Sequence, residues 1–141
     1  QFYEDTLWGD IDYLLVDMPP GTGDVALTVF QSLPIEGVVI VSSPQDLVQV
    51  IVGKAVKMAA MMNVPVLGVV ENMSYMECPE CGHRLEPFGP SHLQEIVDEF
   101  KVADLGRIPI DPKVAASCDA GTFESELPEG LIPEAVSAVE A

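Results

Sequence analysis

The stretch that decides the fold is residues 37–71, with the sequence GVVIVSSPQDLVQVIVGKAVKMAAMMNVPVLGVVE. It opens and closes on short apolar runs, Gly37 to Ser42 and Val66 to Glu71, whose β-branched residues predict two buried strands. The longer segment between them predicts a helix that runs to about Met62, for which Asp46 is a suitable N-cap. A strand, a helix and a second strand in this order predict a right-handed crossover between parallel strands.

The same alternation continues on both sides of this unit. Upstream, the run YLLV at residues 13–16 predicts another buried strand, and Asp24 is a suitable N-cap for the helix that follows it. Downstream, Ser91 to Phe100 predicts an amphipathic helix, Ala103 to Ile108 a short strand and Ile132 to Val139 a last helix. We therefore expect an α/β fold in which a mostly parallel sheet is flanked by helices.

One irregular segment interrupts the alternation. It runs from about residue 73 to residue 90 and carries two cysteines in the motif CPECG. A chain of 141 residues suits a single domain. We therefore expect this segment to be an insertion within one domain, residues 1–141, and not a linker between two.

The composition argues against some classes of function and location. The chain has 23 acidic and 6 basic residues, so its net charge of −17 repels phosphate backbones and anionic lipids. We therefore expect no direct binding to nucleic acid or to a membrane. The acidic start of the sequence does not resemble a signal peptide, and the most apolar region, Ala55 to Val70, is interrupted by Lys57, Asn63 and Pro65. With no pattern of cysteines typical of secreted proteins, these features predict a reducing, cytoplasmic location.

A glycine-rich loop follows the first predicted strand, at the edge of a parallel sheet where ligands gather. Asp17 ends that strand and is suited to hold a magnesium ion through water. The segment Gly21-Thr22-Gly23 can turn its N–H groups towards a phosphate, because glycine lets the backbone approach closely. The alternative is an ordinary turn, with Asp24 only capping the next helix.

Polar residues also follow the later strands. Asn72 comes directly after the strand ending at Glu71, and its amide can hydrogen-bond adenine through both the carbonyl and the amino group. Its alternative role is to hold a turn through a local hydrogen bond. After the last predicted strand, Pro109 can stiffen a loop, and Asp111 can cap a short helix beginning at Pro112.

The pair Cys78 and Cys81 places two thiolates on one tight turn, a spacing that suits a metal ion or one edge of an iron–sulfur cluster. Two thiolates do not complete a tetrahedral site, and a two-fold dimer would supply four. Zinc and a dithiol redox pair remain alternatives for the same motif. We expect Cys118 to be buried, and His83 and His92 to be surface residues and not ligands.

Several motifs occur together in a fixed order: WGDIDYLLVDMPPGTGD (8–24), SSPQDL (42–47), NVPVLGVVENMS (63–74), CPECG (78–82), FG (88–89) and LGRIPIDP (105–112). This set resembles the Mrp-type (ApbC-like) ATPases, iron–sulfur cluster carriers of the MinD-like superfamily of P-loop proteins. The resemblance covers most of the chain and implies the C-terminal part of a P-loop ATPase domain.

The resemblance also implies roles for individual residues. Asp17 would sense Mg²⁺, Gly21 and Thr22 would face the phosphates of ATP, and Asn72 would contact the base. Pro109 and Asp111 would line the adenosine pocket. Cys78 and Cys81 from each of two subunits would hold a bridging [4Fe–4S] cluster, which the homodimer passes to apo-proteins under the control of ATP binding and hydrolysis.

One expected motif is missing. No GxxxxGK[ST] P-loop occurs in the sequence, and GTGD has no lysine to meet the phosphates. We therefore expect this chain alone to be inactive as an ATPase, whereas the complete protein would hydrolyse ATP. We also expect one side of the sheet to lack a neighbour, which leaves apolar surface exposed or paired with another copy of the chain. A zinc-bridged structural module and a MinD-type regulatory ATPase without a cluster remain the alternative functions.

Overall fold

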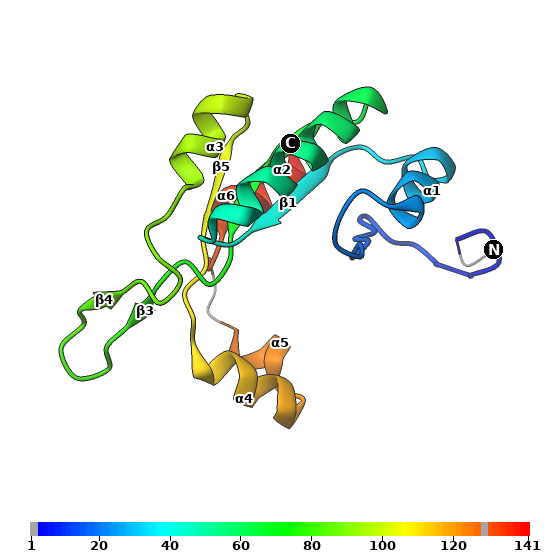
Figure 1. Cartoon of the computed structure of the whole chain (residues 1–141). Helices are drawn as coiled ribbons and strands as arrows, with labels where there is room; N and C mark the ends of the chain where they lie inside the picture. The colour runs from blue at the N-terminus through cyan, green and yellow to red at the C-terminus, as the bar shows by residue number, and fades with distance from the viewer. Residues whose placement is uncertain (1–2, 128–129) are drawn as a thin grey trace.

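A computed structural model describes residues 3–127 and 130–141 of the chain. Its centre is a parallel sheet in the order β1-β2-β5, formed by β1 (Val38–Ser42), β2 (Val66–Glu71) and β5 (Asp104–Arg107). Figure 1 shows the three strands side by side with helices packed against them. The predicted α/β fold with a parallel sheet is therefore confirmed, and the two strands of the central unit lie within one residue of their expected bounds.

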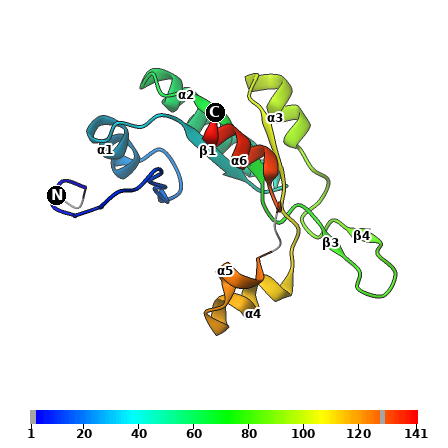
Figure 2. The ribbon, with the colours of Figure 1, turned by 180° about the vertical axis from the view of Figure 1, so that it is seen from behind.

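Helices cover both faces of the sheet. On one face lie α2 (Asp46–Met61) and α3 (Leu93–Phe100), and on the other lies α6 (Pro133–Glu140). Figure 2 shows α6 in front of the sheet, with α2 and α3 behind it. Each face of the sheet has its own hydrophobic core. Neighbouring residues of β2 pack into different cores, because side chains along a strand point alternately to the two faces. The first core is Val52, Val69, Leu93 and Ile96, and the second is Val70, Leu105 and Ala135.

A glycine in the central strand allows β5 to pair closely with β2. A Cβ atom at Gly68 would lie 2.6 Å from the carbonyl oxygen of Ala103, closer than any real side chain tolerates. The neighbouring N–H of Val69 donates a 2.9 Å hydrogen bond to that same oxygen. Gly68 is thus needed for the close backbone approach that begins the β2–β5 pairing.

Smaller elements project from the sheet. Strands β3 (Met76–Glu77) and β4 (Arg84–Leu85) form an antiparallel hairpin between β2 and α3, within the expected insertion. A pair of short helices, α4 (Pro112–Ala120) and α5 (Phe123–Glu126), follows β5. Figures 1 and 2 show the hairpin and the α4–α5 pair extending away from the helix-covered sheet.

The expected strand at residues 13–16 is wrong. The segment has no assigned strand, and its four side chains are exposed. It precedes α1 (Asp24–Ser32), which lies apart from the sheet (Figure 1). A buried strand needs a hydrogen-bonded neighbour, and among the described residues β1 pairs with β2 alone, which leaves its other edge without a strand.

Both expected aspartate N-caps are also wrong. Asp24 and Asp46 are the first residues of α1 and α2, and the cap positions belong to Gly23 and Gln45, neither of which makes a side-chain cap hydrogen bond. The acidic residues still favour these helices, because a negative charge in the first turn interacts well with the helix dipole.

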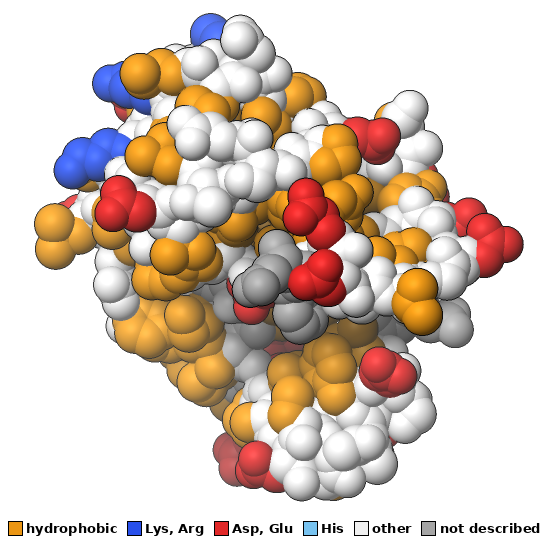
Figure 3. Space-filling view, turned by 90° about the vertical axis from the view of Figure 1, so that its right-hand side faces the viewer, with side chains coloured by type: hydrophobic (Ala, Val, Ile, Leu, Met, Phe, Trp, Pro, Cys, Tyr) orange, Lys and Arg blue, Asp and Glu red, His pale blue; other side chains and the backbone are white. Residues whose placement is uncertain are grey.

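Strand β1 is one edge of the sheet, and apolar side chains are exposed on this side of the molecule. The expected exposure of apolar surface is therefore confirmed. Val41 of β1 is 63% exposed and Leu15 is 82% exposed. Figure 3 views the molecule from the side on which α1 lies in Figure 1, and many apolar side chains are exposed on this face. None of the helices in the described part of the chain is both long and apolar enough to cross a bilayer.

The first core supports a direct prediction about stability. Leu93 is 0% exposed and packs between α3 and the sheet, so Leu93→Ala should lower the free energy of unfolding by about 2–5 kcal/mol in urea denaturation. Leu47, on α2 but 78% exposed, is the matched control, and Leu47→Ala should change stability by less than about 0.5 kcal/mol. Equal losses in the two variants would contradict the assigned core.

Candidate functional site

The candidate site begins where the three parallel strands end. Beyond Ser42 and Glu71 the hydrogen-bond ladder continues, because the N–H of Asn72 donates to the carbonyl of Ser42 at 2.8 Å. On the other edge, the N–H of Ile108 donates to the carbonyl of Glu71 at 2.9 Å, and Ser74 donates to the carbonyl of Ile108 at 3.0 Å. The loops that follow β2 and β5 are therefore held side by side at the edge where ligands of parallel sheets bind.

Asn72 lies in a tight turn within this edge. Its side-chain oxygen accepts a 2.8 Å hydrogen bond from the N–H of Met73, which adopts a left-handed backbone with φ of 56°. The local turn bond expected as the alternative is thus present. A carbonyl oxygen has a second lone pair, and the amino group makes no hydrogen bond within the described residues. The half-buried amide therefore retains both a donor and an acceptor for a base.

Pro109 and Asp111 lie on the loop beside this turn. Ile110, between them, donates from its N–H to the carbonyl of Tyr75, which fixes the loop against the residues that follow Asn72. Asp111 is the N-cap of α4 and accepts a 2.9 Å hydrogen bond from the N–H of Lys113. The capping role expected for Asp111 is confirmed, and a shallow hollow opens beside it towards α5.

The glycine-rich loop lies elsewhere. Asp17, Gly21 and Thr22 are exposed, and Gly21 has the positive φ of 90° that glycine favours. A shallow hollow lined by Pro19, Pro20 and the loop leads to the first turn of α1. Figures 1 and 2 place this segment on the α1 side of the molecule, away from the hairpin. The structure therefore brings Asn72 and Pro109 together but does not bring the glycine loop to them.

The CxxC motif forms the tip of the β3–β4 hairpin. The N–H of Cys78 donates to the carbonyl of His83 at 2.9 Å, and the N–H of Gly82 donates back to the carbonyl of Cys78 at 2.8 Å. Gly82 has a φ of 69°, a left-handed conformation suited to glycine, and this lets the chain turn sharply after Cys81. Both cysteines are free thiols, with Cys78 half-buried and Cys81 exposed.

The turn also favours the ionised form of its first thiol. Hydrogen bonds from the backbone at Glu80 and Cys81, with a smaller contribution from the Cys81 side chain, hold the pKa of Cys78 below its ordinary value. Because the thiolate is the form that binds metals, this backbone geometry prepares Cys78 as a ligand.

Two side-chain contacts order the base of the hairpin. The Arg84 Nε lies 3.2 Å from the Glu77 Oε1, and the Arg84 guanidinium carbon lies 4.2 Å from the centre of the Tyr75 ring. The ion pair is exposed and Tyr75 is half-buried, so each contact contributes little stability, but together they connect both strands to the residue at which the hairpin leaves the sheet.

The hairpin offers only a partial metal site. In the described ranges, 3–127 and 130–141, no group of three or more histidine, cysteine or acidic side chains is placed to hold a metal ion. Cys118 lies on α4 and is exposed, so its expected burial is wrong: α4 packs chiefly against the short helix α5, and among its described residues only Ser117 is buried. Two free thiols on a projecting turn, one half-buried and one exposed, fit one half of a four-thiolate site.

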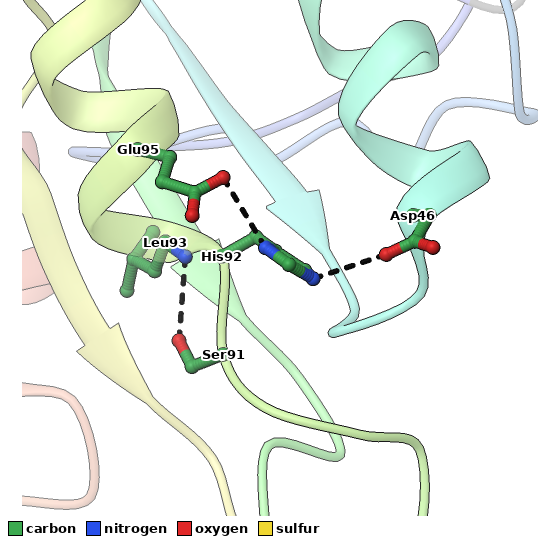
Figure 4. A network of polar contacts seen from close by, with 5 residues as sticks. All are labelled: Asp46, Ser91, His92, Leu93 and Glu95. Atoms are coloured by element: carbon green, nitrogen blue, oxygen red, sulfur yellow. Dashed lines mark hydrogen bonds and ion pairs between the residues drawn. The ribbon is translucent and has the colours of Figure 1, made fainter.

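His92 is not the simple surface residue that its sequence suggests. Its Nε2 lies 3.0 Å from the Asp46 Oδ1 and its Nδ1 lies 3.2 Å from the Glu95 Oε2. Figure 4 shows the partly buried ring between the two carboxylates, so that it links the first turn of α2 to α3. The spacing to Glu95 is visible in the sequence, but the contact with Asp46 exists only in the folded chain.

Sequence reasoning also missed Glu71. This glutamate reads as the polar end of a strand, yet its side chain is fully buried and accepts a hydrogen bond from the Ser74 hydroxyl at 2.5 Å. The other carboxylate oxygen has no hydrogen-bond partner among the described residues. A serine three residues after the glutamate is the only local signal of this contact.

Comparison with known proteins assigns the family. A family model described as ParA, NUBPL iron-transfer P-loop NTPase, matches residues 1–140. An iron–sulfur cluster carrier protein of Methanocaldococcus jannaschii is 44% identical over 122 residues, which are 86% of this chain and 42% of the relative. The carrier protein of Clostridium perfringens is 46% identical over 129 residues, covering 92% of this chain and 45% of the relative.

A solved structure agrees with these matches. It is a nucleotide-binding protein of Archaeoglobus fulgidus in complex with ADP, with cobalt found in it, and it superposes with a TM-score of 0.78 at 45% identity. The similarity covers 88% of this chain and 52% of that one. The chain thus spans less than half the length of the two carrier proteins and about half of the solved structure. Since the family model matches almost every residue, the chain belongs to the NUBPL iron-transfer group of ParA P-loop NTPases.

Proposed function

We propose that this chain is the cluster-holding part of an iron–sulfur cluster carrier. The observation that carries the proposal is the projecting CxxC turn, on which two free thiols are accessible and the backbone favours the thiolate of Cys78. The names of the relatives, iron–sulfur cluster carrier proteins, support the same function. The cluster is the cargo of such a protein, which delivers it to apo-proteins.

The number of ligands requires two copies of the chain. A [4Fe–4S] cluster is held by four thiolates, and each hairpin offers Cys78 and Cys81. A two-fold axis near the hairpin tips would bring the two pairs together without any change in the sheet. The proposed unit is therefore a homodimer joined through the CxxC region, in a cytoplasm reducing enough to keep the thiols free.

Nucleotide control belongs to the complete protein. Asn72, with Pro109 and the Asp111 loop beside it, would recognise adenosine at the sheet edge, as the shared fold with an ADP-bound protein supports. Asp17 would hold Mg²⁺ through water, with Gly21 and Thr22 facing the terminal phosphate. A P-loop on a further segment would grip the phosphates between these two regions, and hydrolysis would release the glycine loop and loosen the grip on the cluster.

Metal loading tests the carrier proposal. Anaerobic reconstitution with iron and sulfide should give a brown protein with about four irons per dimer and no cluster in Cys78→Ser or Cys81→Ser. Cys118→Ser is the matched control and should load normally, because that thiol lies on α4. Stoichiometric zinc that iron cannot replace would instead identify a structural zinc-bridged dimer, and the absence of any metal would favour a regulatory ATPase.

Nucleotide control is tested at Asp17 in a protein that carries both this segment and a P-loop. Asp17→Asn removes the charge that attracts Mg²⁺ while it keeps the side-chain size, so ATP-dependent cluster transfer to an apo-protein should slow by about tenfold or more. Transfer that is unchanged in rate and in ATP dependence would rule out the proposed switch.

The lowered pKa of the Cys78 thiol can be tested by its reactivity in the metal-free chain. The lowered pKa means that Cys78 ionises at a lower pH than an ordinary thiol, so iodoacetamide should alkylate it faster than Cys118 near pH 7. The rate at Cys78 should level off with rising pH below the ordinary thiol pKa of about 8.5, because this thiol is already ionised there. Peptide mass spectrometry reads both sites in one sample, and equal rates at pH 7 would contradict the assignment.

A further inference from the structure

The buried carboxylate of Glu71 is the feature that the proposed function leaves unexplained. Glu71 ends β2 and is 0% exposed, on the same face of the strand as the core residue Val69. A carboxylate in such a place is costly unless its oxygens are paired. One oxygen accepts the 2.5 Å hydrogen bond from Ser74, and the other has no partner within the described residues.

Ser74 is fixed at two points by this arrangement. Its hydroxyl donates to Glu71, and its N–H donates to the carbonyl of Ile108 at 3.0 Å. The short turn between Glu71 and Ser74 contains Asn72 and Met73. Met73 is held at a φ of 56°, an uncommon backbone for a residue with a side chain, which persists only where surrounding contacts impose it. The Glu71–Ser74 bond closes this turn.

The turn leads directly into the cysteine hairpin. Tyr75, the next residue, accepts the N–H of Ile110 through its carbonyl and carries the ring over which Arg84 lies. Strand β3 begins one residue later, at Met76, and Cys78 follows it. The direction in which the hairpin leaves the sheet therefore depends on the backbone between Glu71 and Tyr75.

We propose that Glu71 is a positioning residue of the cluster site, acting through Ser74. Its carboxylate fixes the turn at residues 72–74 and so holds both the Asn72 amide and the root of the CxxC hairpin in one orientation. The inference rests on the proposed carrier function and adds to it a physical connection between the adenosine side of the site and the cluster side. Glu71 touches neither ligand, so its effect reaches the cluster only through the backbone.

The test uses the full 141-residue chain, reconstituted without oxygen, and the variants Ser74→Ala, Glu71→Gln and the double variant. The matched control is Ser117→Ala, since Ser117 is also a buried serine and donates its hydroxyl to the carbonyl of Val114 at 2.9 Å on the distant helix α4. The rate of cluster loss to an iron chelator is measured where circular dichroism finds every variant fully folded.

Loss of the hydrogen bond to the buried carboxylate should speed cluster loss by about fivefold to tenfold in Ser74→Ala, and by less in Glu71→Gln, because the amide oxygen of the new side chain can still accept the Ser74 hydroxyl. The double variant should lose the cluster about as fast as Ser74→Ala, because that change alone already removes the bond. Ser117→Ala should stay within about twofold of the parent. Equal rates in Ser74→Ala, Ser117→Ala and the parent would overturn the proposal.

A second measurement, hydrogen exchange of the Cys78 amide, tests the role of Glu71 independently of whether the chain carries a cluster. If the parent chain takes up no cluster, the carrier proposal fails, and hydrogen exchange of the Cys78 amide in the metal-free chain still tests Glu71. That amide donates to His83 across the hairpin, so Ser74→Ala should speed its exchange by about fivefold or more, whereas Ser117→Ala should not. Unchanged exchange in Ser74→Ala would refute the positioning role. Should Glu71→Gln fail to fold, Ser74→Ala alone decides the outcome.

Discussion

Strand β2 is hydrogen-bonded along both edges and buried on both faces, and the rest of the structure depends on this position. Its pairing with β1 and β5 fixes the order of the sheet. Of its neighbouring residues, Val69 belongs to the core on one face and Val70 to the core on the other. Because the ladder continues beyond Glu71, the turn carrying Asn72 is hydrogen-bonded on both sides, as the strand is. The hairpin with the cysteines follows that turn, so a projecting element is attached directly to the buried central strand.

The other half of the candidate site lacks comparable support. The segment with Asp17 and Gly21 lies beside α1, exposed and without a strand on either side. The outer edge of β1 is equally uncovered in the described residues. Both features agree with a chain that spans about half the length of the relatives it matches, because strands of a parallel sheet reach their final positions only when their neighbours are present.

The parts of the fold that follow from local sequence were predictable. The apolar runs at Val38–Ser42 and Val66–Glu71 are β-branched and of strand length, and the segment between them has helical length, so the crossover follows. The YLLV run has the same local pattern, but a pattern cannot reveal whether a pairing partner exists. The N-caps failed for a related reason, since Asp24 and Asp46 were close enough to each helix start to suggest a cap one residue away from the real one.

The candidate site also has features that the local sequence predicts and features that it does not. The CxxC spacing identifies the thiol pair, and the Asp111 cap is readable from the proline and lysine that follow it. The burial of Glu71 was not readable, because a glutamate after an apolar run usually marks the end of burial. Its burial depends on α2 and α3 covering that face of the sheet, which is a property of the assembled layers and not of the local sequence.

In the proposed carrier, the outward direction of the β3–β4 hairpin would determine how a bound cluster leaves. A cluster bound at the tip would lie beyond the helices that cover the sheet (Figures 1 and 2), with neither core around it. An incoming thiolate of a recipient protein could then displace Cys78 or Cys81 one ligand at a time, with no need to open any packed layer. Delivery would be an exchange of ligands at a surface, and its speed would depend on the reach and charge of the recipient's cysteines. The net charge of −17 on this chain would then favour recipients that present those cysteines within a basic surface.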